Sequence, residues 1–320
     1  MYIVVGTTTV DLFVSGLEQI PRVSGDEFTT NSLAFCANPL LKVLGGNGAN
    51  SAYVLAKLGA PVSLVSACGQ DEMGALVVRW LQGPGVDLQA LVRHPQLATA
   101  TTTVVTDNDF NRLAFHHPGA SHGFGPDDVS DALLERATTL LVTGYSLMPR
   151  FRGTGYARLL SAAKRAGIVT ALDIGPAIAQ PVQLEELAPL LPALDYLLCN
   201  EHELEACVDE HSLHENVDRM LAAGTRCLVL KRGPAGASAW HEDRHVDVPG
   251  FAIEAKFTVG AGDSFNAGFL FSIGAGATLT TALNFANGTA ALVVAGSQGV
   301  LDAPTLAQVE ELLQKKGVTG

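Results

Sequence analysis

The segment FTVGAGDSFNAGF at residues 257–269 says more about this chain than any other stretch. Its small residues Gly260, Ala261 and Gly262 lead directly into a helix that we expect to begin around Asp263. Free backbone N–H groups at a helix start, with the positive end of the helix dipole, favour a bound anion. A carboxylate at the same point can act as a general base while those amides hold a phosphoryl group. Taken alone, the segment fits a phosphotransfer site and, equally, a helix that Asp263 merely caps.

A second glycine-rich segment, VLGGNGANSAYVLAKLG at residues 43–59, also opens a predicted helix. Gly45 and Gly46 form its turn, and Asn47 and Asn50 follow at the mouth of the helix. An amide side chain both donates and accepts hydrogen bonds, which suits a ligand rich in hydroxyl groups. The other interpretation is an ordinary helix start.

Outside these segments, short β-branched runs alternate with longer stretches rich in alanine and leucine. The predicted strands are 2–5, 62–66, 139–143, 168–172, 194–198 and 226–230. The predicted helices are 46–58, 72–82, 153–166, 200–208, 213–223, 263–273, 278–295 and 304–315. This alternation favours an α/β fold with a mainly parallel sheet covered by helices, which we assign to a single domain over residues 1–320.

Two regions interrupt the alternation, at 11–37 and 98–117. Both have extended character, and the turn-rich DNDFN at 107–111 predicts a hairpin in the second. We expect these insertions to pair into a small β-sheet that forms a lid over a cleft. His116 and His117 on this lid are interpreted as exposed hairpin residues.

The two glycine-rich segments together resemble the signature regions of the ribokinase-like (PfkB) carbohydrate kinase family. The resemblance runs along essentially the whole chain. It implies a three-layer α/β/α core with a small β-sheet lid. It also implies transfer of the γ-phosphoryl group of ATP to a hydroxyl of a carbohydrate, with ATP and Mg²⁺ as cofactors.

The resemblance also implies roles for individual residues. Asp263 would be the general base, and Gly260, Ala261 and Gly262 would form the anion hole. The sugar hydroxyls would be held by Asp11, Gly45, Gly46, Asn47 and Asn50. The nucleotide would contact Asn200, Glu203, Lys231, Gly233, Gly236 and Asn287. Glu203 would also lie near Mg²⁺, acting on it through water.

Several of these residues have an alternative interpretation. Asn200 and Glu203 have the spacing of a capping box on the helix at 200–208. Asp11 fits an ordinary turn residue. Asp173 follows a predicted strand at the edge where parallel sheets bind ligands, or it caps a loop.

One position departs from the family pattern. Many relatives carry an aspartate before the threonine of the later segment, where it helps to build a monovalent-cation site, but this chain has Phe257 there, followed by Thr258. Phenylalanine offers no oxygen ligand. We therefore expect weak or absent potassium dependence.

The composition of the chain limits the kinds of partner that we expect it to bind. The formal net charge is −12 and no basic run occurs, so nucleic acid and anionic membranes are not expected partners. The five cysteines contain no C-x-x-C pair, which indicates reduced thiols and no zinc site. The first residues lack a basic region and reach Asp11 early, so we expect no signal peptide and a cytoplasmic location.

We also expect a homodimer formed through the lid. The apolar lid residues that suggest it are Phe28, Phe35, Phe110 and Phe115.

Three other functions remain open from the sequence. A nucleoside kinase of the same family would share the catalytic residues and differ in the acceptor pocket. A catalytically silent regulator that binds a sugar or nucleotide would need neither Asp263 nor the glycine loop. A hydrolase using Ser264 is disfavoured, because no histidine follows His245 and the local pattern is not G-x-S-x-G.

Overall fold

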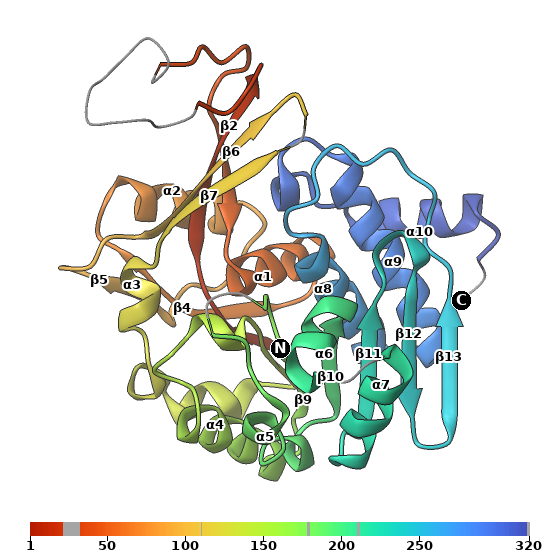
Figure 1. Cartoon of the computed structure of the whole chain (residues 1–320). Coiled ribbons are helices and arrows are strands. Elements are labelled where there is room, and N and C mark those ends of the chain that lie inside the picture. Colours follow the sequence, from red (N-terminus) through yellow and green to blue (C-terminus); the bar gives the residue numbers. More distant parts are fainter. Residues whose placement is uncertain (22–32, 110, 178–179, 210–211, 319–320) are drawn as a thin grey trace.

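A nine-stranded sheet runs through the centre of the computed structural model, with helices on both of its faces (Figure 1). The structure describes residues 1–21, 33–109, 111–177, 180–209 and 212–318. The strands lie in the order β13 (Arg244–Val248), β12 (Ala237–His241), β11 (Cys227–Lys231), β10 (Tyr196–Asn200), β9 (Val169–Asp173), β8 (Thr139–Val142), β1 (Tyr2–Val5), β4 (Val62–Gly69) and β5 (Leu91–His94). All neighbours are parallel except β11 with β12 and β12 with β13.

The sheet separates two apolar cores, because helices cover both of its faces and successive side chains of each strand point to opposite sides. In β1, Val4 contributes to one apolar core, while Ile3 and Val5 contribute to the other. One core is covered by α1 (Asn47–Lys57), α2 (Glu72–Gln82), α8 (Ala261–Gly274), α9 (Leu279–Ala295) and α10 (Leu306–Lys315). The other is covered by α3 (Gly119–Gly123), α4 (Thr154–Arg165), α5 (Leu184–Leu187), α6 (Glu201–Val208) and α7 (Leu213–Ala222). The predicted α/β layers are therefore confirmed.

Short 3₁₀ segments complete the described elements. They are η2 (Pro126–Asp128), η3 (Asp131–Arg136), η4 (Tyr145–Leu147), η5 (Leu191–Ala193), η6 (Gly233–Ala235) and η7 (Gly299–Asp302). None of the helices in the described ranges is long and apolar enough to cross a membrane. All five cysteines are free.

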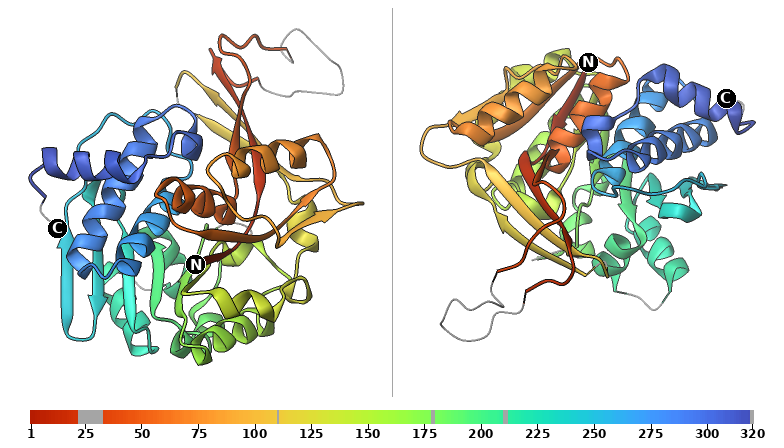
Figure 2. Two further views of the ribbon diagram at one scale, coloured as in Figure 1. Left: turned by 180° about the vertical axis from the view of Figure 1, so that it is seen from behind. Right: turned by 90° about the horizontal axis from the view of Figure 1, so that it is seen from above.

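A second, four-stranded sheet projects from the core, and we call it the lid sheet (Figures 1 and 2). Its order is β3 (Leu41–Gly45), β2 (Thr9–Leu17), β6 (Ala100–Asp107) and β7 (Arg112–His117). The predicted hairpin is the antiparallel pair of β6 and β7. The predicted bounds of the first insertion, 11–37, are wrong, because β2 begins at Thr9 and β3 lies beyond residue 37.

One side of the lid sheet packs against the segment that precedes α8. Phe13 and Val43 are buried there with Val104, and Phe257 and Leu301 pack against them. The rings of Phe13 and Phe257 meet edge to face with their centroids 4.7 Å apart. Phe257 is therefore a packing residue between the core and the lid.

The apolar residues that predicted a lid dimer fall into two groups. Phe35 and Phe115 are exposed, at 86% and 59%. Phe28 and Phe110 lie outside the described residues. The dimer stays a prediction.

Candidate active site

The helix α8 begins at Ala261, two residues earlier than predicted. Gly260 is its N-cap residue, with φ +83, a left-handed conformation that glycine adopts without strain. Asp263 lies inside the first turn, so the interpretation of its side chain as a helix cap is wrong. Its carboxylate is left to make other contacts.

Those contacts come from the second glycine-rich segment. Asn47 Nδ2 donates to Asp263 Oδ1 over 3.0 Å, and Asn50 Nδ2 donates to Asp263 Oδ2 over 2.8 Å. Each carboxylate oxygen is thus held by one amide from the first turn of α1, which packs against α8. The sequence predicted these amides as ligand-binding groups. It did not reveal that they fix the carboxylate.

The surroundings of Asp263 change its acidity. The side chain is 7% exposed, and burial raises its pKa from 3.8 to about 6. The hydrogen bonds from Asn50 and Asn47 oppose this increase, while the nearby Asp173 adds to it. The result is a carboxylate that is ionised at neutral pH and binds protons more strongly than an exposed one.

Asp11 lies in strand β2, so its interpretation as a turn residue is wrong. It is 8% exposed, and Thr9 Oγ1 donates to its Oδ1 over 2.9 Å. A Cβ on Gly45 would lie 2.3 Å from Asp11 Oδ2, so the glycine is required for this approach. Gly46 has φ +86 and is the N-cap residue of α1. Asp11 is therefore brought beside the turn that carries Asn47.

A buried lysine lies on the other side of the anion loop. Lys231 ends β11, and its Nζ donates to Asp173 Oδ1 over 2.6 Å and to Asn266 Oδ1 over 3.3 Å. A Cβ on Gly262 would lie 3.6 Å from the same Nζ. An ammonium group thus adjoins the loop Gly260–Gly262 at the start of α8.

Asp173 joins this cluster at the end of β9. Its other oxygen, Oδ2, accepts a hydrogen bond from Thr143 Oγ1 over 2.9 Å. Asp173 and Lys231 occupy the carboxyl ends of parallel strands, the edge where open α/β sheets bind ligands. The position of Asp173 after a predicted strand was the available signal for it.

Asn200 and Glu203 form the capping box of α6. Asn200 Oδ1 accepts from Glu203 N, and Glu203 Oε2 accepts from Asn200 N, both over 2.8 Å. Burial and the nearby Asp173 raise the pKa of Glu203 to about 7, while Lys231 opposes the increase. The capping interpretation is confirmed, and the raised pKa places this carboxyl group in the same electrostatic cluster as Asp263.

The carboxylates of this cluster fit a Mg²⁺ ion that arrives with a nucleotide. Within the described ranges, no group of three or more His, Cys, Asp or Glu side chains forms a ready metal site. Mg²⁺ usually keeps several waters and takes one or two carboxylates plus substrate phosphates. Glu203 supplies one carboxylate of this kind, and the charges of Asp173 and Asp263 act on it.

The remaining predicted nucleotide residues have structural partners. Gly233 begins η6 and Gly236 is its C-cap residue, where a Cβ would clash with the carbonyl oxygen of Val248. Asn287, on α9, donates from Nδ2 to Pro249 O over 3.2 Å. These contacts shape the turn between β11 and β12 and the loop after β13.

Ser264 is unsuited to act as a nucleophile. It is fully buried, and its Oγ donates to Gly260 O over 2.7 Å within the first turn of α8. The hydroxyl stabilises the helix start that carries Asp263.

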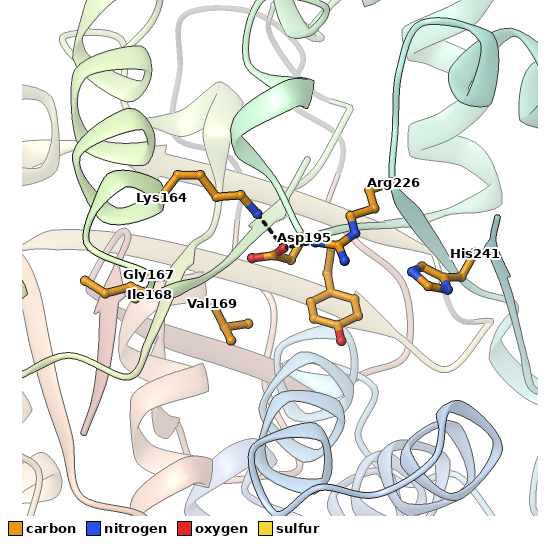
Figure 3. Close-up of a pocket in the computed structure, with 8 residues that line it drawn as sticks. Lys164, Gly167, Ile168, Val169, Asp195, Arg226 and His241 are labelled. Atoms are coloured by element: carbon orange, nitrogen blue, oxygen red, sulfur yellow. Dashed lines mark hydrogen bonds and ion pairs between the residues drawn. The ribbon is translucent and has the colours of Figure 1, made fainter.

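A cavity of about 300 Å³ lies elsewhere, at the amino ends of β9, β10 and β11 (Figure 3). In it, Asp195 accepts from Lys164 Nζ over 2.6 Å and from Arg226 Nη1 over 2.8 Å. None of the residues predicted for the functional site lines this cavity. The candidate site occupies the opposite edge of the sheet.

Comparisons with known proteins agree with this geometry. A family model described as "pfkB family carbohydrate kinase" matches residues 26–306. An ATP-dependent ribose-1-phosphate kinase of Halopiger xanaduensis is 29% identical over 85% of this chain and 87% of its own length. A nucleoside kinase of Methanothermobacter thermautotrophicus is 28% identical over 84% of each chain. A ribokinase of Bacillus subtilis is 29% identical over 97% of this chain and 98% of its own.

Solved structures show the same fold. Arabidopsis thaliana ribokinase, solved with ribose and ATP, superposes with a TM-score of 0.82 at 25% identity and covers 98% of both chains. A nucleoside kinase of Methanocaldococcus jannaschii reaches a TM-score of 0.80 at 21% identity over 98% of both chains. The ribokinase-like fold implied by the two glycine-rich segments is therefore confirmed.

Proposed function

Because this chain belongs to the pfkB family of carbohydrate kinases, we propose that it transfers the γ-phosphoryl group of ATP to a sugar hydroxyl with Asp263 as the general base. The chain is an ATP-dependent carbohydrate kinase; its acceptor and the roles of its residues are the proposal. The main support for these roles is the hydrogen-bonded unit Asn47–Asp263–Asn50, which joins the two glycine-rich segments.

Asp263 removes the proton from the acceptor hydroxyl as the new P–O bond forms. The amides of Asn47 and Asn50 fix the direction of the carboxylate, so little reorientation is needed on the way to the transition state. A pKa of about 6 keeps the group ionised at neutral pH while increasing its proton affinity.

The transferring phosphoryl group is held by the loop Gly260–Gly262 and by Lys231. The loop supplies backbone N–H groups at the start of α8, and the helix dipole adds to their effect. The ammonium of Lys231 lies beside Gly262, and Asp173 holds it there. In a buried setting this fixed positive charge stabilises negative charge that spreads over the phosphoryl oxygens.

Mg²⁺ would neutralise the charge of the nucleotide phosphates when bound. Glu203 would hold it through water, and Asn200 keeps the Glu203 backbone in place through the capping box. Lys231, Gly233, Gly236 and Asn287 complete the proposed nucleotide-binding set.

The acceptor sugar is proposed to lie between Asp263 and the lid sheet. Asp11, Gly45, Gly46, Asn47 and Asn50 would hold its hydroxyls. In the described part of the chain, Asn50 Oδ1 is a buried acceptor without a hydrogen-bond partner, so Asn50 has bonding capacity that the protein itself does not use.

A nucleoside is the second candidate acceptor, favoured by the likeness to the nucleoside kinase of Methanothermobacter thermautotrophicus. ADP release with ATP and Mg²⁺ across sugars, sugar acids, polyols and nucleosides separates the two acceptor classes.

The variant Asp263→Asn tests the mechanism. It preserves the shape of the side chain and removes the base, so we expect turnover to fall by roughly 10²–10⁴ with acceptor binding largely kept. Ser264→Ala is the matched control, since it removes only the bond to Gly260 O. Unchanged turnover in Asp263→Asn, or full loss in Ser264→Ala alone, would contradict the assignment.

A further inference from the structure

Three polar side chains form a row across the lid sheet. Asp11 of β2 pairs with Thr102 of β6, and Thr102 pairs with His116 of β7. Directly paired residues of neighbouring strands point to the same face of a sheet. His116 therefore shares a face with Asp11, which lies against Gly45 beside the proposed acceptor site.

Hydrogen bonds connect this row. Thr102 Oγ1 lies 3.1 Å from His116 Nδ1, and the Thr102 side chain, beside Asp11 on the same face, opposes the rise that burial causes in the pKa of that carboxyl group. A hydroxyl has one proton, so when Thr102 donates to the Asp11 carboxylate it accepts from the Nδ1–H of His116. This arrangement fixes the ring and leaves Nε2 as the nitrogen available to a ligand.

Four basic or titratable groups lie on β7 and on the neighbouring α3, in a chain whose net charge is −12. Arg112 is four residues before His116 on β7, so the two share a face, and the charge of Arg112 acts on Asp11. His122 of α3 and His117 of β7 act electrostatically on His116. Among the residues that the structure describes, neither Arg112 nor these histidines has an ion pair with a carboxylate.

We propose that His116, with Arg112 and His122, binds an anionic substituent, a phosphate or a carboxylate, on the acceptor sugar. The inference rests on the proposed function and names its substrate class. Neighbouring strands lie about 4.8 Å apart, so His116 is about 10 Å from Asp11 across the sheet. That span exceeds a sugar ring and suits a substituent at the end remote from the reacting hydroxyl.

The electrostatics of His116 agree with this assignment. His116 is exposed, but partial burial of its ring lowers its pKa, and the nearby His122 and His117 lower it further. Asp11, Arg112 and His122 are the charged or titratable groups that adjoin the row from β2, β7 and α3. A bound anion would reverse the repulsion and raise the pKa of His116, so binding should take up a proton and strengthen as pH falls.

The test compares acceptors that differ in one charged group: ribose with ribose 1-phosphate, and glucose with gluconate. In at least one of these pairs, we expect the anionic acceptor to have a lower KM than the neutral acceptor. His116→Gln should raise that KM roughly tenfold with kcat little changed, because a charge-assisted hydrogen bond is lost. It should leave the KM of the neutral sugar unchanged. His117→Gln is the matched control, since His117 pairs with Thr101 and faces the opposite side of β7.

Calorimetry separates this proposal from the reaction itself. Binding of ribose 1-phosphate and of gluconate is measured with Asp263→Asn in two buffers that differ in ionisation enthalpy, which reports proton uptake. Gluconate stays ionised throughout, so its proton uptake belongs to the protein. Loss of uptake in His116→Gln supports the proposal even where catalysis fails.

Three results would overturn the inference: a preference for neutral sugars or nucleosides, equal effects of the two histidine variants, or binding of the anionic sugars without proton uptake. A preference for the phosphate or the carboxylate identifies the anion. If no acceptor is phosphorylated while the anionic sugars still bind through His116, the proposed function fails and the subsite stands.

Discussion

At the scale of single residues, the site depends on which neighbours a side chain has. Asp263 looks like a capping residue in the sequence, yet both of its oxygens are held by amides more than 200 positions earlier in the chain. Burial then changes its acidity. Motif spacing predicted the residue types at the site, but it contains no information on contacts between distant segments.

The pH dependence of the reaction should follow Asp263. Its pKa is raised to about 6, and only the ionised carboxylate accepts a proton. We therefore expect kcat/KM for a neutral acceptor to rise with pH up to about 6 and to level off above it. A pH–rate profile checks this. A profile that is flat from pH 5 to 7 would contradict the role of Asp263.

Asp173 should act by positioning Lys231. In Asp173→Asn the ion pair is lost, and Lys231 keeps its hydrogen bond to Asn266 and the weaker fields of Glu203 and Asp263. We expect the free energy of unfolding to fall by about 3 kcal/mol. Turnover should also fall, because the ammonium is no longer fixed beside Gly262. Urea unfolding and steady-state kinetics measure the two effects.

Thr143→Val is the matched control for that variant. It removes the other hydrogen bond to Asp173 and leaves the ion pair intact. A smaller loss of turnover than in Asp173→Asn is expected. Equal losses would mean that Asp173 acts through general stability rather than through Lys231.

At the scale of elements, the helices and buried strands with strong apolar patterns were predicted to within a few residues. The sequence missed β5, β12 and β13 of the central sheet, β3 of the lid sheet, and the short helices α3 and α5. The residues of β13 are mostly exposed, and β5 is short and half polar, so neither has the apolar run that identifies a buried strand. The lid sheet was predicted from its hairpin, but its packing on Phe257 was not.

The contact between Phe13 and Phe257 should hold the lid sheet against the loop before α8. Phe13 is 9% exposed, and Phe13→Ala should lower the free energy of unfolding by about 3 kcal/mol and raise the KM of the acceptor. Lys42→Ala on the exposed face of β3 is the control, with a change within about 0.5 kcal/mol. Equal stability of both variants would show that the contact contributes little.

At the scale of the whole molecule, the residues of the candidate site come from every third of the sequence, and Asp173, Lys231 and Asp263 meet at one edge of the central sheet. The topology explains this, because parallel strands end at the same edge. The family resemblance predicted the fold and the kind of reaction. The acceptor could not be predicted, because it depends on the register of the lid strands, which only the structure provides.

The response of the enzyme to monovalent cations follows from Phe257. Its ring packs edge to face against Phe13, three residues before the loop Gly260–Gly262. We expect turnover to change by less than about twofold when potassium replaces sodium, because an apolar ring cannot ligate a cation. Activity assays in the two chloride salts at equal ionic strength measure this. A large activation by potassium would contradict it.

The apolar cluster between lid and core also sets how the molecule responds to cold. Any outward movement of the lid sheet must bring Phe13, Val43, Val104 and Phe257 into water. Hydration of apolar surface carries a positive heat capacity, and its free-energy cost falls on cooling. The equilibrium between closed and open lids should therefore shift towards the open form at low temperature, with a curved dependence on temperature.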